Sequence, residues 1–254
     1  MIKPGELIQL VSPKGKRYLR IADPEDVMHT HDGRLELASV LAVDFGQSVQ
    51  THLGRPYRVI KPTLHDLIKN VERQTQIIYP KDIGYIVLKL GVGPGTRIVE
   101  AGSGSGSLTL ALAWFAGSRG MVHTFERREQ FRDLCRRNLE RVGLQDRVRF
   151  HLRDLEEGFG LDEEAESLFM DVRTPWEYLE QIPPAVRNGG PVGFLLPTTN
   201  QVADLLAAMQ GLPFTDQEVV EILLRRYKPV ADRLRPEDRM VAHTGYLIFA
   251  RIQK

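Results

Sequence analysis

Three glycines at alternate positions form the pattern in this chain that most clearly suggests chemistry. Gly102, Gly104 and Gly106 follow a short run from Ile98 to Ala101 and precede a stretch of helix-forming residues that begins at Leu108. This order predicts a strand, a glycine loop and a helix. Glycine adopts positive φ and lets a ligand approach the backbone, and a helix N-terminus offers free N–H groups. Together these features predict a cradle for a nucleotide-like ligand.

The glycine spacing leaves the identity of that ligand open. A dinucleotide-binding fingerprint requires Gly-x-Gly-x-x-Gly, but the position three residues after Gly104 is Ser107, and the third glycine comes one residue early. Glu100 precedes the loop, where its carboxylate would repel a pyrophosphate but could meet a cation, such as a sulfonium with an amino-acid tail. Glu126 ends the next apolar run and is placed to accept hydrogen bonds from ribose hydroxyls. Because NAD sites also bind ribose hydroxyls through an acidic residue, Glu126 predicts a ribose but does not identify the cofactor that carries it.

Acidic residues also follow two further apolar runs, at Asp154 and Asp171. Ligands of an open α/β sheet lie beyond the carboxyl ends of the strands, so these acids are expected to meet there. As a set they fit a nucleoside, with Glu126 on the ribose, Asp154 on an adenine amino group and Asp171 beside the reactive centre. Each acid taken singly is equally compatible with capping a helix. Phe131 could lie against the adenine ring, and packing in the core explains it about as well.

The elements that must position these residues alternate between strand and helix from residue 97 to residue 210. This alternation predicts an α/β fold with a mostly parallel, Rossmann-like sheet. Segments 219–226 and 245–252 are expected to close the sheet as an antiparallel terminal pair. Short strands and turns before residue 62 predict a small N-terminal β module. The expected parts are a β module at 1–62, a helical linker and pocket segment at 63–82, and a catalytic domain at 83–254.

Local signals place several helices more closely. Thr63 followed by Asp66 predicts an N-cap with a capping box. A second helix is expected at 83–90. A third is expected at 176–187, broken by Pro183-Pro184, because proline disrupts a helix interior.

Composition limits the class of protein. The chain has 254 residues, a formal net charge of +1 and 42% hydrophobic residues, enough for a sizeable core. The one cysteine, Cys135, excludes an intramolecular disulfide and is expected to be a core thiol. No apolar run approaches the ~20 residues of a membrane span, and the N-terminus lacks a signal-peptide core. We therefore expect a cytoplasmic protein, and no metal site at His29 and His31, which lack neighbouring ligands at a suitable spacing.

Basic residues concentrate in three stretches although the net charge is small. These stretches are 14–20, 127–153 and 225–239. Such runs are usually solvated surfaces. Three of them in a nearly neutral chain moderately favour contact with RNA or DNA.

The order of these motifs resembles the class I S-adenosylmethionine methyltransferases, and more narrowly the tRNA (adenine(58)-N1)-methyltransferase family. The glycine loop is shared by many methyltransferases, whereas Tyr-Pro-Lys-Asp and His-Thr-Gly-Tyr are much more particular. The chain departs from the family pattern at Ala242, where a glycine is expected, and at 172–174, where the family is more apolar. The stretches that carry the resemblance are Thr51–Gly54, Gln76–Asp82, Ala101–Thr109 and Arg233–Leu247.

The resemblance implies a specific reaction, the transfer of a methyl group from S-adenosylmethionine to N1 of the T-loop adenine at position 58 of tRNA, giving 1-methyladenosine. It implies that Asp171 is catalytic through the exocyclic amino group of the adenine, and that Tyr79 borders the target base. It further implies tRNA as partner and a homo-oligomer, typically a tetramer. The cofactor-binding residues it implies are Gly102, Ser103, Gly104, Ser105, Gly106, Ser107, Leu108, Glu126, Phe131, Asp154 and Asp171.

Two alternatives stay open beside this hypothesis. One is a class I methyltransferase acting on a protein carboxyl group or a small molecule. The other is a non-catalytic tRNA-binding subunit, which would be free to lose its loop glycines, Glu126 and Asp171, all of which this chain keeps. A nicotinamide dehydrogenase is disfavoured by the third glycine and by the lack of an evident hydride-site His or Tyr-Lys pair.

Overall fold

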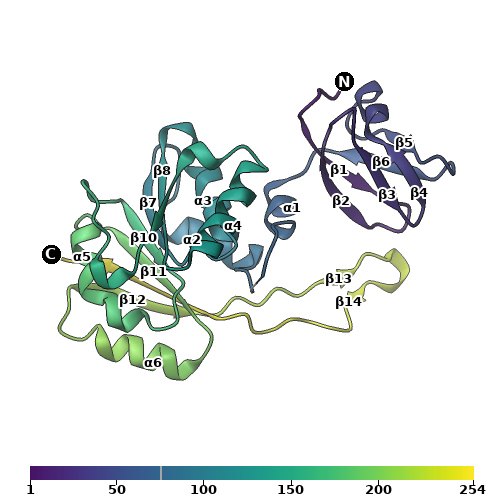
Figure 1. The fold of residues 1–254 in the computed structure, drawn as a ribbon. Helices are drawn as coiled ribbons and strands as arrows, with labels where there is room; N and C mark the ends of the chain where they lie inside the picture. The colour runs from purple at the N-terminus through teal and green to yellow at the C-terminus, as the bar shows by residue number, and fades with distance from the viewer. Residues whose placement is uncertain (75) are drawn as a thin grey trace. The chain divides into compact units, whose positions relative to one another are not determined.

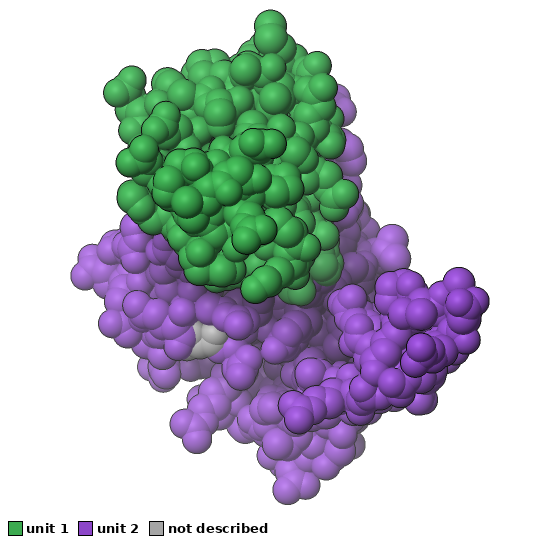
Figure 2. All heavy atoms as spheres, turned by 90° about the vertical axis from the view of Figure 1, so that its right-hand side faces the viewer, with its two compact units in different colours: residues 1–70 green, residues 71–254 purple. Residues whose placement is uncertain are grey.

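A computed structural model describes residues 1–74 and 76–254 of the chain. The chain divides into an N-terminal unit, residues 1–70, and a C-terminal unit, residues 71–254, drawn in green and purple in Figure 2. The predicted boundaries at 62 and 82 differ from this division. The first predicted helix belongs to the N-terminal unit, and residues 71–82 belong to the C-terminal unit.

The N-terminal unit is built on a four-stranded antiparallel sheet in the order β2-β1-β6-β5 (Figure 1). The predicted β module is therefore confirmed. Its core side chains include the fully buried Tyr57, Ile8 and Leu10. The elements are β1 Leu7–Val11, β2 Arg17–Ile21, β3 Val27–Thr30, β4 Gly33–Glu36, the 3-10 helix η1 Leu37–Ala42, β5 Ser48–Gln50 and β6 Pro56–Ile60.

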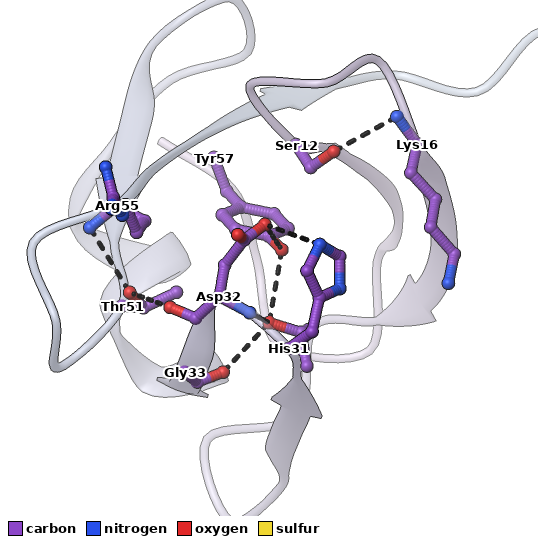
Figure 3. A network of polar contacts seen from close by, with 9 residues as sticks. Ser12, Lys16, His31, Asp32, Gly33, Thr51, Arg55 and Tyr57 are labelled. Atoms are coloured by element: carbon purple, nitrogen blue, oxygen red, sulfur yellow. Dashed lines mark hydrogen bonds and ion pairs between the residues drawn. The ribbon is translucent and has the colours of Figure 1, made fainter.

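A polar network inside this unit gives a structural role to Thr51–Gly54, one of the stretches that carry the family resemblance (Figure 3). The buried Tyr57 hydroxyl donates a hydrogen bond to Asp32 Oδ2 at 2.9 Å. The Thr51 hydroxyl donates to the backbone carbonyl of Asp32 at 2.8 Å and accepts from the N–H of Arg55 at 3.2 Å. The Thr51–Gly54 stretch thus fastens its own turn to the turn between β3 and β4, which is a structural task.

Helix α1, Leu64–Lys69, begins with the predicted capping box. The Thr63 hydroxyl accepts from the N–H of Asp66, and the Asp66 carboxylate accepts from the N–H of Thr63 at 3.0 Å. The two side chains satisfy backbone donors that an isolated helix end leaves unpaired, so the helix begins where the local sequence predicts.

The C-terminal unit is built on a seven-stranded sheet in the order β12-β15-β11-β10-β7-β8-β9. Strands β11, β10, β7, β8 and β9 run parallel, and β15 pairs antiparallel with both β11 and β12. The predicted mostly parallel sheet with an antiparallel terminal pair is confirmed. The strands are β7 Arg97–Ala101, β8 Met121–Glu126, β9 Val148–Leu152, β10 Ser167–Met170, β11 Pro191–Leu196, β12 Phe214–Val220 and β15 Tyr246–Ile252.

Helices flank this sheet and begin at its strand ends. The apolar helix α3 is buried along most of its length, which places it in the core next to β7 and β8. Helix α4 packs on β8 and β9, and its Cys135 is buried as expected. The helices are α2 Pro80–Lys89, α3 Ser107–Ala116, η2 Gly117–Arg119, α4 Glu129–Glu140, η3 Gln145–Arg147, η4 Leu155–Glu157, η5 Pro175–Gln181, α5 Ile182–Ala185 and α6 Thr199–Ala208.

Three predicted elements were placed wrongly. The strand expected at 219–226 is β12, at 214–220, because its antiparallel pairing with β15 runs from Phe214 opposite Ile252 to Val220 opposite Leu247. The helix expected at 176–187 is the 3-10 helix η5 followed by the short α5. Its two prolines lie in the first turn of α5. Proline is tolerated there because backbone N–H groups in the first turn of a helix make no intrahelical hydrogen bond. Helix α2 begins at Pro80 rather than at residue 83, for the same reason.

Residues 221–244 form a long hairpin arm that extends away from the sheet of its own unit (Figure 1). Its short strands β13, Tyr227–Lys228, and β14, Arg235–Pro236, pair antiparallel, and the 3-10 helix η6, Ala231–Arg233, lies between them. The arm carries a cluster of exposed apolar side chains. They are Leu223, Leu224, Tyr227, Val230, Leu234, Met240 and Val241.

Candidate active site

The glycine loop joins the end of β7 to the start of α3, and each glycine has a separate physical reason. All three have positive φ, of 92°, 51° and 81° at Gly102, Gly104 and Gly106. A Cβ on Gly102 would collide with the backbone carbonyl of Asp171, and one on Gly106 would lie 2.7 Å from Cys135 Sγ. A Cβ on Gly104 would meet nothing within 4 Å. The loop is therefore packed against β10 and α4 at its two ends and has open space at its middle.

A cavity of about 310 Å³ opens beyond the carboxyl ends of the parallel strands. It brings together four of the predicted site residues, Gly102, Glu126, Asp154 and Asp171, which follow or end β7, β8, β9 and β10. Adjacent parallel strands deliver their ends to one edge of the sheet, which is why residues far apart in sequence meet. The remaining lining residues are Phe125, Arg127, Arg128, Arg153, Leu155, Val172, Arg173, Thr174 and Tyr178.

Glu126 is held from two sides. Its Oε2 atom accepts a hydrogen bond from the N–H of Gly104 at 3.4 Å, and its Oε1 atom accepts from the N–H of Arg128 at 3.0 Å. The Nε atom of Arg128 lies 3.4 Å from the same Oε1 atom. The side chain is 6% exposed. The carboxylate is thus oriented before any ligand arrives, between the glycine loop and the first turn of α4.

Asp171 presents a carboxyl group without a hydrogen-bond partner among residues 1–74 and 76–254. Its backbone N–H donates to the carbonyl of Ala101 at 2.8 Å, which fixes the residue at the end of β10 beside the glycine loop. Surrounding protein raises the pKa of Asp171 to about 6, and the charge of Glu126 adds to the rise. Solvent nevertheless reaches the side chain through the open cavity.

Asp154 caps a short helix and also lies in the lining of the cavity. It is the N-cap of η4, where its carboxylate accepts from the N–H of Glu156 at 3.2 Å, and it also lines the cavity. One carboxylate oxygen is used locally. The other is available to a donor in the cavity, such as an amino group.

Phe131 and Tyr79 lie outside the set of described residues that line this cavity. Phe131 is 5% exposed and packs in the core, with the Arg128 guanidinium 4.0 Å from its ring centroid. Tyr79 is half-buried at the N-cap of α2. Neither ring belongs to the described lining of the cavity, and their contacts with adenine stay predictions.

The serines of the loop and Leu108 also lie outside that lining set. The side chains of Ser103, Ser105, Ser107 and Leu108 are all buried. Ser103 Oγ, for example, lies 2.8 Å from Thr124 Oγ1. Ser105 Oγ is buried without a hydrogen-bond partner among the described residues, and the contacts of all four residues with a ligand stay predictions.

Glu100 is placed differently from its expected role at a cation. Its side chain is 1% exposed and accepts hydrogen bonds from the hydroxyls of Thr109 at 2.5 Å and Thr124 at 2.6 Å. Burial raises the pKa of Glu100 to about 8 despite these hydrogen bonds. The expectation is corrected because the carboxyl group is enclosed in the core between β7, β8 and α3.

Sequence reasoning missed a buried ionic network near the site. Lys81 Nζ donates to Asp82 Oδ1 at 2.7 Å, to the carbonyl of Ile222 at 2.7 Å and to Thr244 Oγ1 at 2.6 Å. Thr244 in turn donates to Asp82 Oδ2 at 2.9 Å. The two particular stretches, Tyr-Pro-Lys-Asp and His-Thr-Gly-Tyr, therefore meet in space. The sequence signalled this contact only indirectly, because both stretches are particular to the family that the chain resembles.

A nucleoside with an amino-acid tail fits these groups. Three carboxylates in one cavity suit hydroxyl and amino donors, and the open space at Gly104 lets a ligand approach the loop backbone. Within the described residues, no group of three or more His, Cys, Asp or Glu side chains is arranged to hold a metal ion. The same residues include no helix with the length and apolarity needed to cross a membrane.

Comparisons with known proteins agree with this arrangement. Residues 57–238 match the family model described as tRNA methyltransferase complex GCD14 subunit. The chain is 34% identical over 252 residues to the tRNA (adenine(58)-N(1))-methyltransferase TrmI of Thermus thermophilus, covering 99% of this chain and 98% of the relative.

Two solved structures are similar over the whole chain. The crystal structure of tRNA (m1A58) methyltransferase TrmI from Aquifex aeolicus has a TM-score of 0.84 and 39% identity, covering 100% of this chain and 99% of that one. A structure described as a SAM-dependent O-methyltransferase from Thermotoga maritima has a TM-score of 0.92 and 41% identity, covering 100% of this chain and 95% of that one.

Proposed function

Because the chain belongs to the GCD14 tRNA methyltransferase family, we propose that it transfers a methyl group from S-adenosylmethionine to N1 of the adenine at position 58 of tRNA. The product is 1-methyladenosine in the T-loop. One observation of the structure carries the proposal. The cavity combines a glycine loop with three carboxylates, at Glu126, Asp154 and Asp171, on the ends of adjacent strands.

Two carboxylates of the cavity and the adjoining glycine loop hold the cofactor. Glu126 accepts hydrogen bonds from the ribose hydroxyls, for which its orientation by Gly104 and Arg128 prepares it. Asp154 accepts from the adenine amino group, and the backbone of the loop at Gly104 receives the rest of the molecule. S-adenosylmethionine supplies an activated methyl group, so the task of the protein is mainly to orient the reactants and to exclude water.

Asp171 acts on the target adenine. The base must leave its place in the T-loop and enter the cavity before it can react. The Asp171 carboxylate accepts a hydrogen bond from the exocyclic amino group, and this bond strengthens as positive charge develops on the base during methyl transfer. Its carboxyl oxygens have no other hydrogen-bond partner within the described residues, and its pKa of about 6 leaves it mostly ionised at neutral pH. Tyr79 is proposed to border the base from the N-terminus of α2.

The arm at residues 221–244 supports the proposal of a homo-oligomer, with a tetramer inferred from the family resemblance. It carries seven exposed large apolar side chains, and apolar surface of this kind is suited to contact with another protein chain. The basic residues of the same arm and of α4 suit contacts with RNA phosphates. We propose that the protein works in the cytoplasm, where its tRNA substrate would meet it.

Methyl transfer from labelled S-adenosylmethionine to an unmodified tRNA transcript, followed by nucleoside analysis, tests the proposal. We expect 1-methyladenosine with the wild-type chain, none when the position-58 adenine is replaced, and far less of it with Asp171→Asn. Cofactor binding without an RNA product would overturn the tRNA assignment and favour another acceptor, in line with the O-methyltransferase description of one structural neighbour. Loss of cofactor binding itself would favour a non-catalytic tRNA-binding subunit.

A further inference from the structure

Two arginines that line the cavity carry no counter-ion. Neither Arg127 nor Arg173 forms an ion pair within residues 1–74 and 76–254, and both side chains are exposed. The other two arginines of the lining differ, because Arg128 pairs with Glu126 and Arg153 lies 3.9 Å from Glu157. A cation that lines a cavity without a protein partner is available for an anionic group of a ligand.

The sheet topology places these two arginines on either side of the glycine loop. Arg127 directly follows β8 and Arg173 lies in the loop after β10, while β7, which leads into the glycine loop, lies between those strands. Arg127 and Arg173 therefore line the cavity from two loops on opposite sides of the glycine loop.

We propose that Arg127 and Arg173 form a phosphate-binding subsite at the mouth of the cavity, which holds the RNA backbone next to the nucleotide that enters it. This subsite rests on the proposed function, because its ligand is the tRNA substrate of that reaction. Arg173 is two residues beyond Asp171, so a base held by the Asp171 carboxyl brings its own flanking phosphates to the region of Arg173. Guanidinium groups bind phosphate oxygens through paired hydrogen bonds.

The same chemistry could in principle serve the carboxylate of the cofactor, and the structure favours the phosphate. S-adenosylmethionine carries one carboxylate, and the N-terminus of the ten-residue helix α3 already offers N–H groups and a positive dipole end to it. A nucleic acid carries a phosphate on each side of every internal nucleotide. Two cations on opposite sides of the glycine loop match that arrangement better than a single carboxylate.

The test compares Arg127→Ala, Arg173→Ala and the double variant with Arg119→Ala as a matched control. Arg119 is also exposed and without an ion pair among the described residues, but it precedes β8 and so lies at the opposite edge of the sheet. Binding of fluorescent tRNA is measured over a series of salt concentrations. Binding of S-adenosylmethionine is measured by calorimetry, and methyl transfer to tRNA is followed separately.

We expect each single variant to bind tRNA about tenfold more weakly at low salt and to reduce the salt-dependence slope by about one, with about two for the double variant. Cofactor affinity should stay at the wild-type value in all of them, and Arg119→Ala should bind tRNA normally. Wild-type tRNA binding in both single variants would overturn the subsite. Weaker cofactor binding with unchanged tRNA binding would also overturn it, in favour of the carboxylate.

The two proposals can fail independently. If the wild-type chain makes no 1-methyladenosine but the arginine variants still lose tRNA affinity and salt dependence, the proposed reaction is wrong and the phosphate subsite stands. If the wild-type chain methylates tRNA and the variants bind it normally, the reaction stands and the subsite is wrong.

Discussion

The buried pair Lys81 and Asp82 allows a quantitative prediction about stability. Lys81→Met keeps most of the side-chain length and removes the charge and its three donated hydrogen bonds. Asp82 then keeps Thr244 as a donor but loses its counter-ion inside the protein. The two side chains are only 9% and 2% exposed, so solvent cannot replace the lost partner.

Removing one partner of a buried ion pair typically costs about 3–5 kcal/mol. In a domain of roughly 150–250 residues each kcal/mol lowers Tm by about 2–4 °C, so Lys81→Met should lower the Tm of the C-terminal unit by about 6–20 °C. The matched control is Lys89→Met on the same helix, which removes the pair with Glu218. Those side chains are 36% and 39% exposed, and such a surface pair contributes about 0–1 kcal/mol.

Thermal unfolding followed by circular dichroism or calorimetry measures both variants. The double variant Lys81→Met/Asp82→Leu should recover part of the loss, because it removes the unpaired buried charge as well. A Tm for Lys81→Met equal to that of Lys89→Met would refute the reasoning, since it would mean that burial does not govern the strength of this pair. Asp82 and Thr244, which are 162 residues apart in sequence, would then be in contact without contributing to the stability of the fold.

Three further outcomes are expected. Asp171→Asn should lower kcat by about 10²–10⁴. The wild-type rate should rise with pH through about 6 as the Asp171 carboxyl ionises. If the residual rate of the variant rises with pH in the same way, another group is responsible for that pH dependence. Glu126→Ala should weaken S-adenosylmethionine binding by about 1–3 kcal/mol in calorimetry, and an unchanged affinity would remove it from the ribose. The Glu221 carboxylate and the Pro197 carbonyl raise the pKa of His243, so its stabilisation is complete below its ordinary pKa and lost as pH rises through the raised value. The Tm difference between wild type and His243→Gln should therefore shrink in alkaline buffer, and a constant difference would count against a charged His243.

Much of the site was predictable because its residues follow a simple rule of topology. Glu126, Asp154 and Asp171 each come at or just after the end of a parallel strand, and parallel strands bring those ends to one edge of the sheet. Their cofactor and substrate roles remain predictions that the assays above test. The orientation of each side chain was less predictable. Glu100, within β7, is enclosed in the core because of what packs around that strand.

Tertiary pairing decided the features that sequence reasoning misplaced. The bounds of β12 follow from its register with β15, a strand some thirty residues later, although Gly211 and Pro213 mark a turn just before Phe214. The prolines expected to break a helix instead lie in the first turn of a new one, because the preceding 3-10 helix ends just before them. For β12 the deciding partner lies outside the window that a local pattern covers.

The sequence by itself determined the glycine loop, the capping box at Thr63 and Asp66, and the alternation that makes a mostly parallel sheet. These follow from φ preferences, short-range hydrogen bonds and hydrophobic periodicity, which act within a few residues. Only the tertiary structure decided that Lys81 meets Thr244 and that Arg127 and Arg173 face one cavity without counter-ions. Those facts depend on which distant side chains share a space, and that is fixed by strand order and packing rather than by local sequence.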